Sequence, residues 1–205
     1  MNTTPIEVDW FLKSLNHHNL SDDDICYYFM EYTSHGGYGA SDANQLILNF
    51  KKDLSNKGKV GWGYKEQAVQ KIAGIYSKEL VKIIDFKTST LIPIPPSKCK
   101  VNPLHDDRMM KLLKKVSESN GADVREILYL QKDMIASHTG GSRNVCEIME
   151  YISIDEGQCN DVKEHIILFD DLLVTGAHFA ACKNIILNQF PEKRVFGVFI
   201  ARVIQ

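Results

Sequence analysis

Four apolar residues in succession, residues 166–169, precede two acidic residues, Asp170 and Asp171. An uninterrupted apolar run of this length is typical of a strand buried on both faces, as in the centre of a parallel sheet. A short turn follows the acidic pair, and a helical pattern continues from there to about Asn188. The segment therefore predicts a strand, a loop and a helix, with the acidic pair at the carboxyl end of the strand, where open α/β sheets bind ligands.

Other apolar runs repeat this alternation from about residue 86 to the C-terminus. Strands are predicted at residues 91–94, 127–130, 148–154 and 195–201, and a helix at residues 106–116. Strands that alternate with helical patterns indicate an α/β fold with a central, mostly parallel sheet and flanking helices. We assign residues 86–205 to this α/β core.

The first part of the chain has a helical pattern instead. Apolar residues recur at helical spacing over residues 21–33, 41–54 and 64–84. Ser21 and Ser41 stand where helix N-caps are expected, and glycine-rich breaks separate the three segments. We therefore expect an N-terminal helical subdomain, residues 1–85.

Composition narrows the classes of partner. The formal net charge is −2 over 205 residues, so no basic excess indicates nucleic acid. No apolar run has the length of a membrane helix and the N-terminus has no signal-peptide pattern, so we expect a cytoplasmic protein without a membrane partner. The five cysteines include no CxxC pair, so neither a zinc site nor a disulfide framework is predicted.

The turn after the acidic pair has chemistry suited to phosphate. A helix N-terminus presents unpaired N–H groups, so the amides of residues 174–178 could hold a phosphate group. Gly176 allows close approach of the backbone, and the Thr175 hydroxyl supplies another donor. Asp170 and Asp171 would repel a phosphate, so they need another partner, either sugar hydroxyls or Mg²⁺.

Two other interpretations of the acidic strand stay open. The Mg²⁺-binding strand of a P-loop ATPase also ends in acidic residues, but the chain contains no GxxxxGK[ST] sequence. A purely structural strand and turn is the second, although it would not require paired acids before Thr-Gly.

The motif resembles the signature of the type I phosphoribosyltransferases, which is an apolar strand, two acidic residues, two small or apolar residues and a phosphate loop ending in Thr-Gly-x-Thr/Ser. The resemblance implies that Asp170 and Asp171 hold the ribose hydroxyls of phosphoribosyl pyrophosphate (PRPP) and are the candidate Mg²⁺ ligands. It assigns the 5′-phosphate to Leu172, Leu173, Val174, Thr175, Gly176, Ala177 and His178. In this loop His178 stands where the family has Thr or Ser. Val174 stands where hypoxanthine-guanine enzymes carry an acidic residue, which argues against their purine chemistry.

A second segment, PPSK at residues 95–98, follows the strand predicted at residues 91–94. It is similar to the pyrophosphate-binding segment of the family, in the form nearest to the bacterial competence-associated branch. By that resemblance Ser97 and Lys98 contact the diphosphate, with Lys100 or Arg108 assisting. On its residues alone, a surface turn is the preferred interpretation of the segment, and the acidic motif downstream is what favours a diphosphate site.

The polar stretch at residues 131–144 is long for a connection and resembles the flexible loop that covers the pyrophosphate in the family. Its basic candidates are Lys132, His138 and Arg143, and each of them could equally be a solvated loop residue. Arg143 is preferred because a guanidinium binds phosphate through two parallel hydrogen bonds.

The resemblance implies a pentosyltransferase of nucleotide metabolism, which transfers the 5-phosphoribosyl group from PRPP to a nitrogen acceptor and releases diphosphate with Mg²⁺ as cofactor. The implied catalytic residues are Asp170, Asp171 and Arg143. The helical residues 1–85 would form the variable hood that selects the acceptor. Many relatives dimerise, so a homodimer is compatible with the resemblance. The alternative is a non-catalytic module that binds PRPP or a nucleotide monophosphate and signals to a partner.

Overall fold

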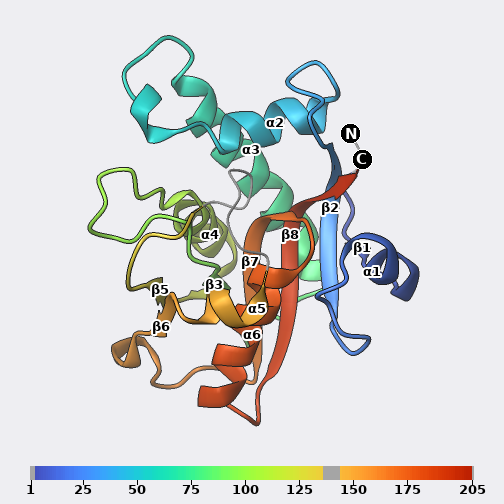
Figure 1. Ribbon diagram of the computed structural model, residues 1–205, viewed down its shortest axis with the longest axis vertical. Coiled ribbons are helices and arrows are strands. Elements are labelled where there is room, and N and C mark those ends of the chain that lie inside the picture. The colour runs from blue at the N-terminus through green and yellow to red at the C-terminus, as the bar shows by residue number, and fades with distance from the viewer. Residues whose placement is uncertain (1–2, 136–143, 205) are drawn as a thin grey trace.

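The computed structural model of the protein describes residues 3–135 and 144–204. These residues form an α/β fold with a mixed, mostly parallel six-stranded sheet flanked by helices, as predicted (Figure 1). The order across the sheet is β1-β2-β8-β7-β3-β4, and β1 pairs antiparallel with β2 while the other neighbours are parallel.

The strands of this sheet are β1 (Ile6–Glu7), β2 (Cys26–Thr33), β3 (Ser89–Pro93), β4 (Asp123–Val124), β7 (His165–Leu173) and β8 (Arg194–Ile204). A separate antiparallel pair is formed by β5 (Leu128–Leu130) and β6 (Ile152–Ile154). The α-helices are α1 (Trp10–Asn16), α2 (Asp42–Phe50), α3 (Gly63–Glu79), α4 (Arg108–Asn120), α5 (Val145–Met149) and α6 (Ala177–Gln189). Short 3₁₀ turns occur at Leu54–Asn56, Leu80–Lys82 and Glu156–Gln158.

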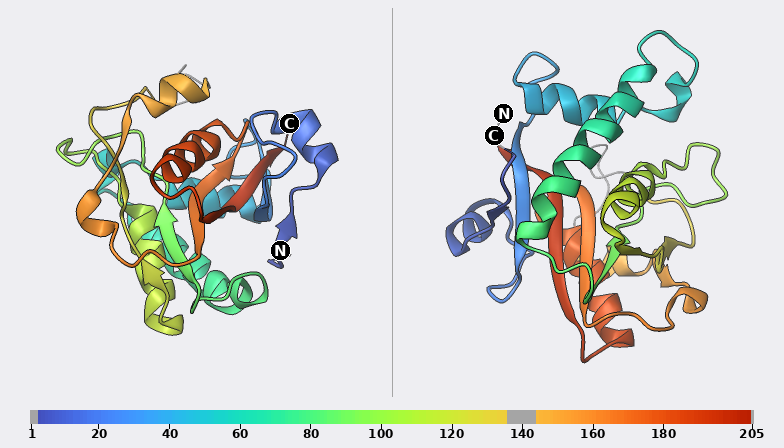
Figure 2. Two further views of the ribbon diagram at one scale, coloured as in Figure 1. Left: turned by 90° about the horizontal axis from the view of Figure 1, so that it is seen from below. Right: turned by 180° about the vertical axis from the view of Figure 1, so that it is seen from behind.

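Alternate residues of β7 enter two different apolar clusters, because successive side chains of a strand point to opposite faces of the sheet. Ile166 and Leu168 pack in the cluster that includes Phe179 of α6. Ile167 and Phe169 pack in the other cluster, with the apolar side chains of α2, α3 and α4. The helices α5 and α6 thus cover one face and α3 the other (Figures 1 and 2), which leaves β7 buried on both faces as its sequence predicts.

Most of the expected elements are confirmed, because local signals define them. Ser41 caps α2 by accepting a hydrogen bond from the Asn44 amide, and Gly121 ends α4 with a left-handed φ of 65°. The predicted α3, β3, β5, α6 and β8 are present within a few residues of their expected bounds.

The expectation of a helix at residues 21–33 is wrong, since Cys26–Thr33 is the strand β2, paired in parallel with β8. A short buried apolar run does not distinguish a strand from a helix by its periodicity, and here the pairing with β8 decides. The N-terminal residues therefore contribute β1 and β2 to the same sheet as the later strands. The division at residue 85 stays a prediction.

Two further expectations are corrected at the second half of the chain. The strand predicted at residues 148–154 is confirmed only for β6, because Asn144 caps a short helix, α5, that ends at Met149. The strand β7 continues past the acidic pair to Leu173, so the two carboxylates lie within the strand rather than after it.

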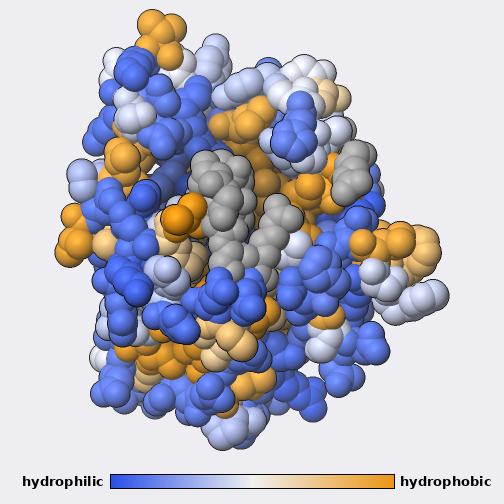
Figure 3. All heavy atoms as spheres, in the orientation of Figure 1, coloured by the Kyte–Doolittle hydropathy of each residue, from blue (hydrophilic) through white to orange (hydrophobic). Residues whose placement is uncertain are grey.

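Polar side chains cover much of the face shown in Figure 3, while exposed apolar side chains gather at α1. Trp10, Phe11 and Leu15 of this helix are all exposed. In the part of the chain that the structure describes, no helix combines the length and the apolar character needed to span a bilayer.

Candidate functional site

The carboxyl ends of β3 and β7 meet at one edge of the sheet. The two strands are parallel neighbours in which Pro93 pairs with Phe169, and the Ile94 amide donates a hydrogen bond of 2.8 Å to the Phe169 carbonyl. The loop after β3 therefore begins beside Asp170. The two strand ends that the sequence singled out are brought together by this register.

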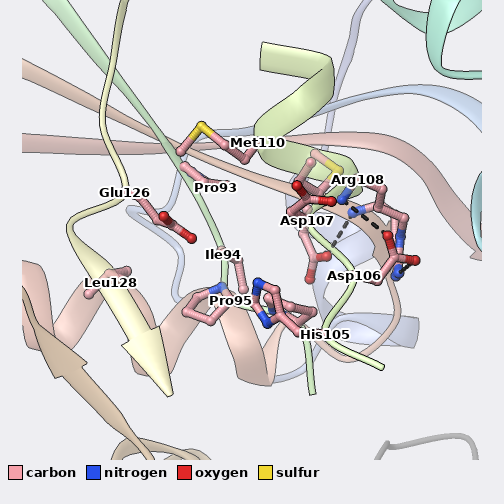
Figure 4. Close-up of a pocket in the computed structure, with 14 residues that line it drawn as sticks. Pro93, Ile94, Pro95, His105, Asp106, Asp107, Arg108, Met110, Glu126 and Leu128 are labelled. Carbon is pink, nitrogen blue, oxygen red and sulfur yellow. Dashed lines mark hydrogen bonds and ion pairs between the residues drawn. The ribbon is translucent and has the colours of Figure 1, made fainter. Parts of the chain in front are cut away.

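A pocket of about 400 Å³, open solvent included, lies at this edge (Figure 4). It is lined by residues 93–96, 105–110, 126, 128, 170 and 171. Apolar side chains such as Met110 and Leu128 form part of the wall. Five carboxylates also line it, those of Asp106, Asp107, Glu126, Asp170 and Asp171, against one guanidinium, that of Arg108.

Asp171 is the centre of a buried ion network. Its Oδ1 accepts from Lys51 Nζ at 2.8 Å, and its Oδ2 accepts from Arg108 Nη2 at 2.5 Å and Nε at 3.1 Å. Arg108 also donates to Asp106 at 2.8 Å, and Asp106 accepts from Lys65 Nζ at 2.7 Å. This network joins β7 to α2, α3 and the first residue of α4.

The network fixes the charges of its members. Burial opposes ionisation of Asp171, but the charges of Lys51 and Arg108 outweigh it and lower the pKa of this carboxyl. Burial likewise would lower the pKa of the Arg108 guanidinium, and the charges of Asp171 and Asp106 raise it instead. Asp171 is therefore an anion whose two oxygens are both engaged.

Asp170 has a different environment. Its Oδ1 accepts a hydrogen bond of 2.7 Å from the Asp171 amide, and the described residues offer it no ion pair. Burial and the neighbouring charge of Asp171 raise the pKa of the Asp170 carboxyl above its usual range. Both residues line the pocket, and of the two Asp170 is the member with an oxygen that no described side chain engages.

The loop between β7 and α6 has the backbone features of an anion site. Gly176 adopts a left-handed φ of 87°, and the Thr175 hydroxyl accepts from the Ala177 amide at 3.4 Å. Among the described residues, the amides of Thr175, Gly176 and His178 have no hydrogen-bond acceptor. Burial lowers the pKa of the His178 imidazole, which favours its neutral form. None of residues 172–178 lines the pocket described above.

The diphosphate candidates are only partly assembled. Pro95 and Pro96 line the pocket, whereas Ser97 and Lys98 do not. Lys98 Nζ pairs with Asp133 Oδ2 at 3.3 Å.

Other basic candidates also have partners or fall outside the structure. Lys100 pairs with Glu126 at 2.8 Å, and Lys132 Nζ lies 4.7 Å from the centre of the Tyr151 ring. His138 and Arg143 lie outside the described residues, so their predicted roles stay predictions.

The residues that sequence reasoning missed are Lys51, Lys65 and Asp106. They are separated from their partners by up to 120 positions, and each lies near the end of an element where a charged residue is ordinary. The sequence shows no local signal that would have identified them.

The described residues contain no group of three or more His, Cys, Asp or Glu side chains arranged to hold a metal ion. Lys51 and Arg108 pair with the two oxygens of Asp171, so a metal ion bound there would have to displace one of these cations, and the predicted role of metal ligand stays a prediction.

Comparison of the chain with protein-family models and with curated proteins finds no match. The fold and the site together define an α/β protein with an acidic pocket at the carboxyl edge of its sheet and, after β7, a loop whose amides include three without an acceptor among the described residues.

Proposed function

We propose that this protein binds PRPP at the carboxyl edge of β7 and transfers its 5-phosphoribosyl group to a nitrogen acceptor, as a type I phosphoribosyltransferase. The observation that carries the proposal is the adjacency of the acidic pair, the loop with free amides before α6, and the proline loop after β3. A sugar with a phosphate at one end and a diphosphate at the other matches these three features, with the sugar at the acidic pair, the phosphate at the amides and the diphosphate at the proline loop.

Each feature has a role in this proposal. Asp170 accepts hydrogen bonds from the ribose hydroxyls, and the amides of residues 174–178 hold the 5′-phosphate. Asp171 acts indirectly, because it pairs with Lys51 and holds Arg108, which lines the pocket. Ser97, Lys98 and Arg143 are proposed diphosphate contacts, which requires Lys98 to exchange Asp133 for the substrate.

The reaction breaks the bond between the anomeric carbon and the diphosphate oxygen, and the electron pair leaves on diphosphate. A bond from the acceptor nitrogen to the same carbon forms, and the proton of that nitrogen passes to solvent. The carboxylates around the pocket stabilise positive charge that develops on the sugar. They also oppose an uncompensated diphosphate, so we propose that PRPP enters as its Mg²⁺ complex.

A non-catalytic module that binds PRPP or a nucleotide monophosphate is the second candidate. The observation that favours it is the engagement of Asp171, which leaves one free carboxylate for the sugar where the family motif supplies two. The replacement of the usual Thr or Ser by His178 points in the same direction.

Release of diphosphate distinguishes the two functions. The protein is incubated with PRPP, Mg²⁺ and a panel of nitrogen acceptors, beside Asp170→Asn and the control Asp42→Asn, whose side chain is exposed at the start of α2. The proposal predicts acceptor-dependent release that Asp170→Asn reduces at least about a hundredfold, the usual size of a catalytic contact, and that Asp42→Asn leaves unchanged. Tight PRPP binding without release under any acceptor would replace the enzyme with the binding module.

A further inference from the structure

A short N-terminal segment, residues 17–20, packs against the loop that connects β7 to α6. The Asn19 amide donates a hydrogen bond of 3.0 Å to the Thr175 carbonyl, and the His17 ring Nδ1 hydrogen-bonds the Val174 carbonyl. We call residues 17–20 the support segment. Two successive carbonyls of the loop are thus turned toward it.

Peptide geometry converts these two contacts into a statement about the amides. In a planar trans peptide unit the carbonyl and the N–H point in opposite directions. The units whose carbonyls belong to Val174 and Thr175 carry the N–H groups of Thr175 and Gly176. Both N–H groups therefore point away from the support segment, and these are amides for which the described residues supply no acceptor.

A side-chain contact fixes the same loop from the same side. A Cβ atom placed on Gly176 would lie 2.7 Å from Leu20 Cδ2 and 2.8 Å from Leu20 Cγ, closer than carbon atoms tolerate. Leu20 itself is buried in the apolar cluster that contains Phe179 of α6. The loop and the support segment are therefore closely packed at the residue whose left-handed φ shapes the turn.

The support segment is itself anchored to the body of the protein. The Ser21 amide donates to Asp24 Oδ2 at 2.7 Å, and Asp24 forms an ion pair of 2.5 Å with Lys183 of α6. Asp24 is buried, so this pair is more than a surface contact. The ion pair therefore ties the support segment to α6, the helix that follows the loop.

His17 is fully buried, and the structure shows no partner for its Nε2 among the described residues. Its one side-chain hydrogen bond is the contact with the Val174 carbonyl. Because a carbonyl only accepts, Nδ1 carries the proton. The imidazole is therefore committed to orienting this loop.

We propose that the support segment holds the carbonyls of Val174 and Thr175 so that the amides of Thr175 and Gly176 face an incoming phosphate. His17 and Leu20 are positioning residues in this account, since they act through the loop and contact no ligand. The inference rests on the proposed function for the identity of the anion, the 5′-phosphate of a phosphoribosyl compound. In this proposal the N-terminal part of the chain contributes to the phosphate site by orienting its amides.

Two probes separate positioning from general stability. Calorimetric titration of the protein with ribose 5-phosphate reports the 5′-phosphate site, and titration with inorganic diphosphate reports the other end of the site. We expect Leu20→Ala and His17→Phe to weaken ribose 5-phosphate binding about tenfold and to leave diphosphate binding unchanged. The control Leu130→Ala removes a leucine of β5 that is buried in the same apolar cluster, and it should change neither affinity.

The titrations distinguish a failure of the proposed function from a failure of the role given to the support segment. No binding of ribose 5-phosphate by the wild-type protein would overturn the proposed function, and the role of the support segment with it. Wild-type binding that Leu20→Ala and His17→Phe leave unchanged, or that Leu130→Ala weakens equally, would overturn the support segment alone.

A double-mutant cycle tests the contact without any ligand. Gly176→Ala adds a Cβ against Leu20, and Leu20→Ala removes the atoms that it meets. We expect Gly176→Ala to lower the unfolding midpoint by a smaller amount in the Leu20→Ala background than in the wild type, because only the φ strain is left. Equal losses in both backgrounds would contradict the packing on which the inference stands.

Discussion

Asp170 and Asp171 are neighbours in sequence but belong to different environments. Asp171 is buried between Lys51 and Arg108, and its pKa is lowered despite burial. Asp170 has no ion pair among the described residues, and burial with the charge of Asp171 raises its pKa. The two acidic residues of one motif therefore have different roles. Asp171 belongs to a buried ion network, and Asp170 is a carboxyl group at the pocket that pairs with no described cation.

The difference follows from the alternation of side chains along a strand. Residues 167 and 169 face the apolar cluster formed with α2, α3 and α4, and Asp171 continues toward that side, where Lys51 and Arg108 lie. A carboxylate of this pair stays available to a ligand only on the side where the helices supply no cation to pair with it. The comparison teaches that an acidic pair has to be assigned one carboxylate at a time.

The largest expected effect comes from Asp171→Asn, which disrupts the buried ion network with Lys51 and Arg108. Removing one member of a buried ion network leaves Arg108 and Lys51 without their shared anion, and we expect a loss of about 3 kcal/mol in the free energy of unfolding. Urea denaturation measures it. A loss below about 1 kcal/mol would mean that the network contributes little and that the two carboxylates are less different than their surroundings suggest.

Asp170→Asn should have the opposite effect on the free energy of unfolding at neutral pH. It removes a carboxyl whose ionisation is disfavoured by burial and by the charge of Asp171, so we expect stability at pH 7 to rise by at least about 1 kcal/mol, the equivalent of roughly one pKa unit. A raised pKa in the folded state contributes stability that is present at acid pH and lost as the pH rises through it. The gain of the variant over the wild type should therefore grow as the pH is raised, as denaturation at several pH values would reveal.

The N-terminal side of the site has its own pH dependence through His17. Burial lowers the pKa of this imidazole from its ordinary 6.5, so its contribution to stability is present above that value and is lost as the pH falls. We expect His17→Phe to flatten the acid side of the stability profile. The exposed neighbour His18, changed to Gln, is the matched control, and an identical profile for both variants would refute the assignment.

The smallest effect is expected at Lys98→Ala. Its pair with Asp133 joins side chains that are 40% and 34% exposed, so solvent screens it and no measurable change in stability should follow. If Lys98 contacts diphosphate, the same variant weakens calorimetric binding of inorganic diphosphate. Unchanged diphosphate binding would remove Lys98 from the site.

Local signals predicted much of the fold and singled out the two strands, β3 and β7, whose ends meet at the candidate site. Ser41 and the glycine breaks mark α2 and α3, and the apolar run before Asp170 marks the central strand. The strand β2 was mistaken for a helix because a short buried run carries no period that separates the two. Its partner, β8, lies at the other end of the chain.

The partners of the acidic pair could not be predicted for a related reason. Lys51 reaches Asp171 across 120 positions, and the choice between Asp170 and Asp171 depends on which helices cover each face. The support segment is also far in sequence from the loop that it contacts, since residues 17–20 meet residues 174–176 only after the sheet has formed. Such contacts are properties of the packing and leave no mark in a local pattern.

The most direct test of the account is a calorimetric titration with PRPP, in the presence and absence of Mg²⁺, of the wild-type protein and Asp170→Asn. The account predicts binding in the micromolar range, about −8 kcal/mol, that Mg²⁺ strengthens and that Asp170→Asn abolishes while the variant stays folded. Absence of PRPP binding by the wild-type protein, or equal binding by both proteins, would contradict it.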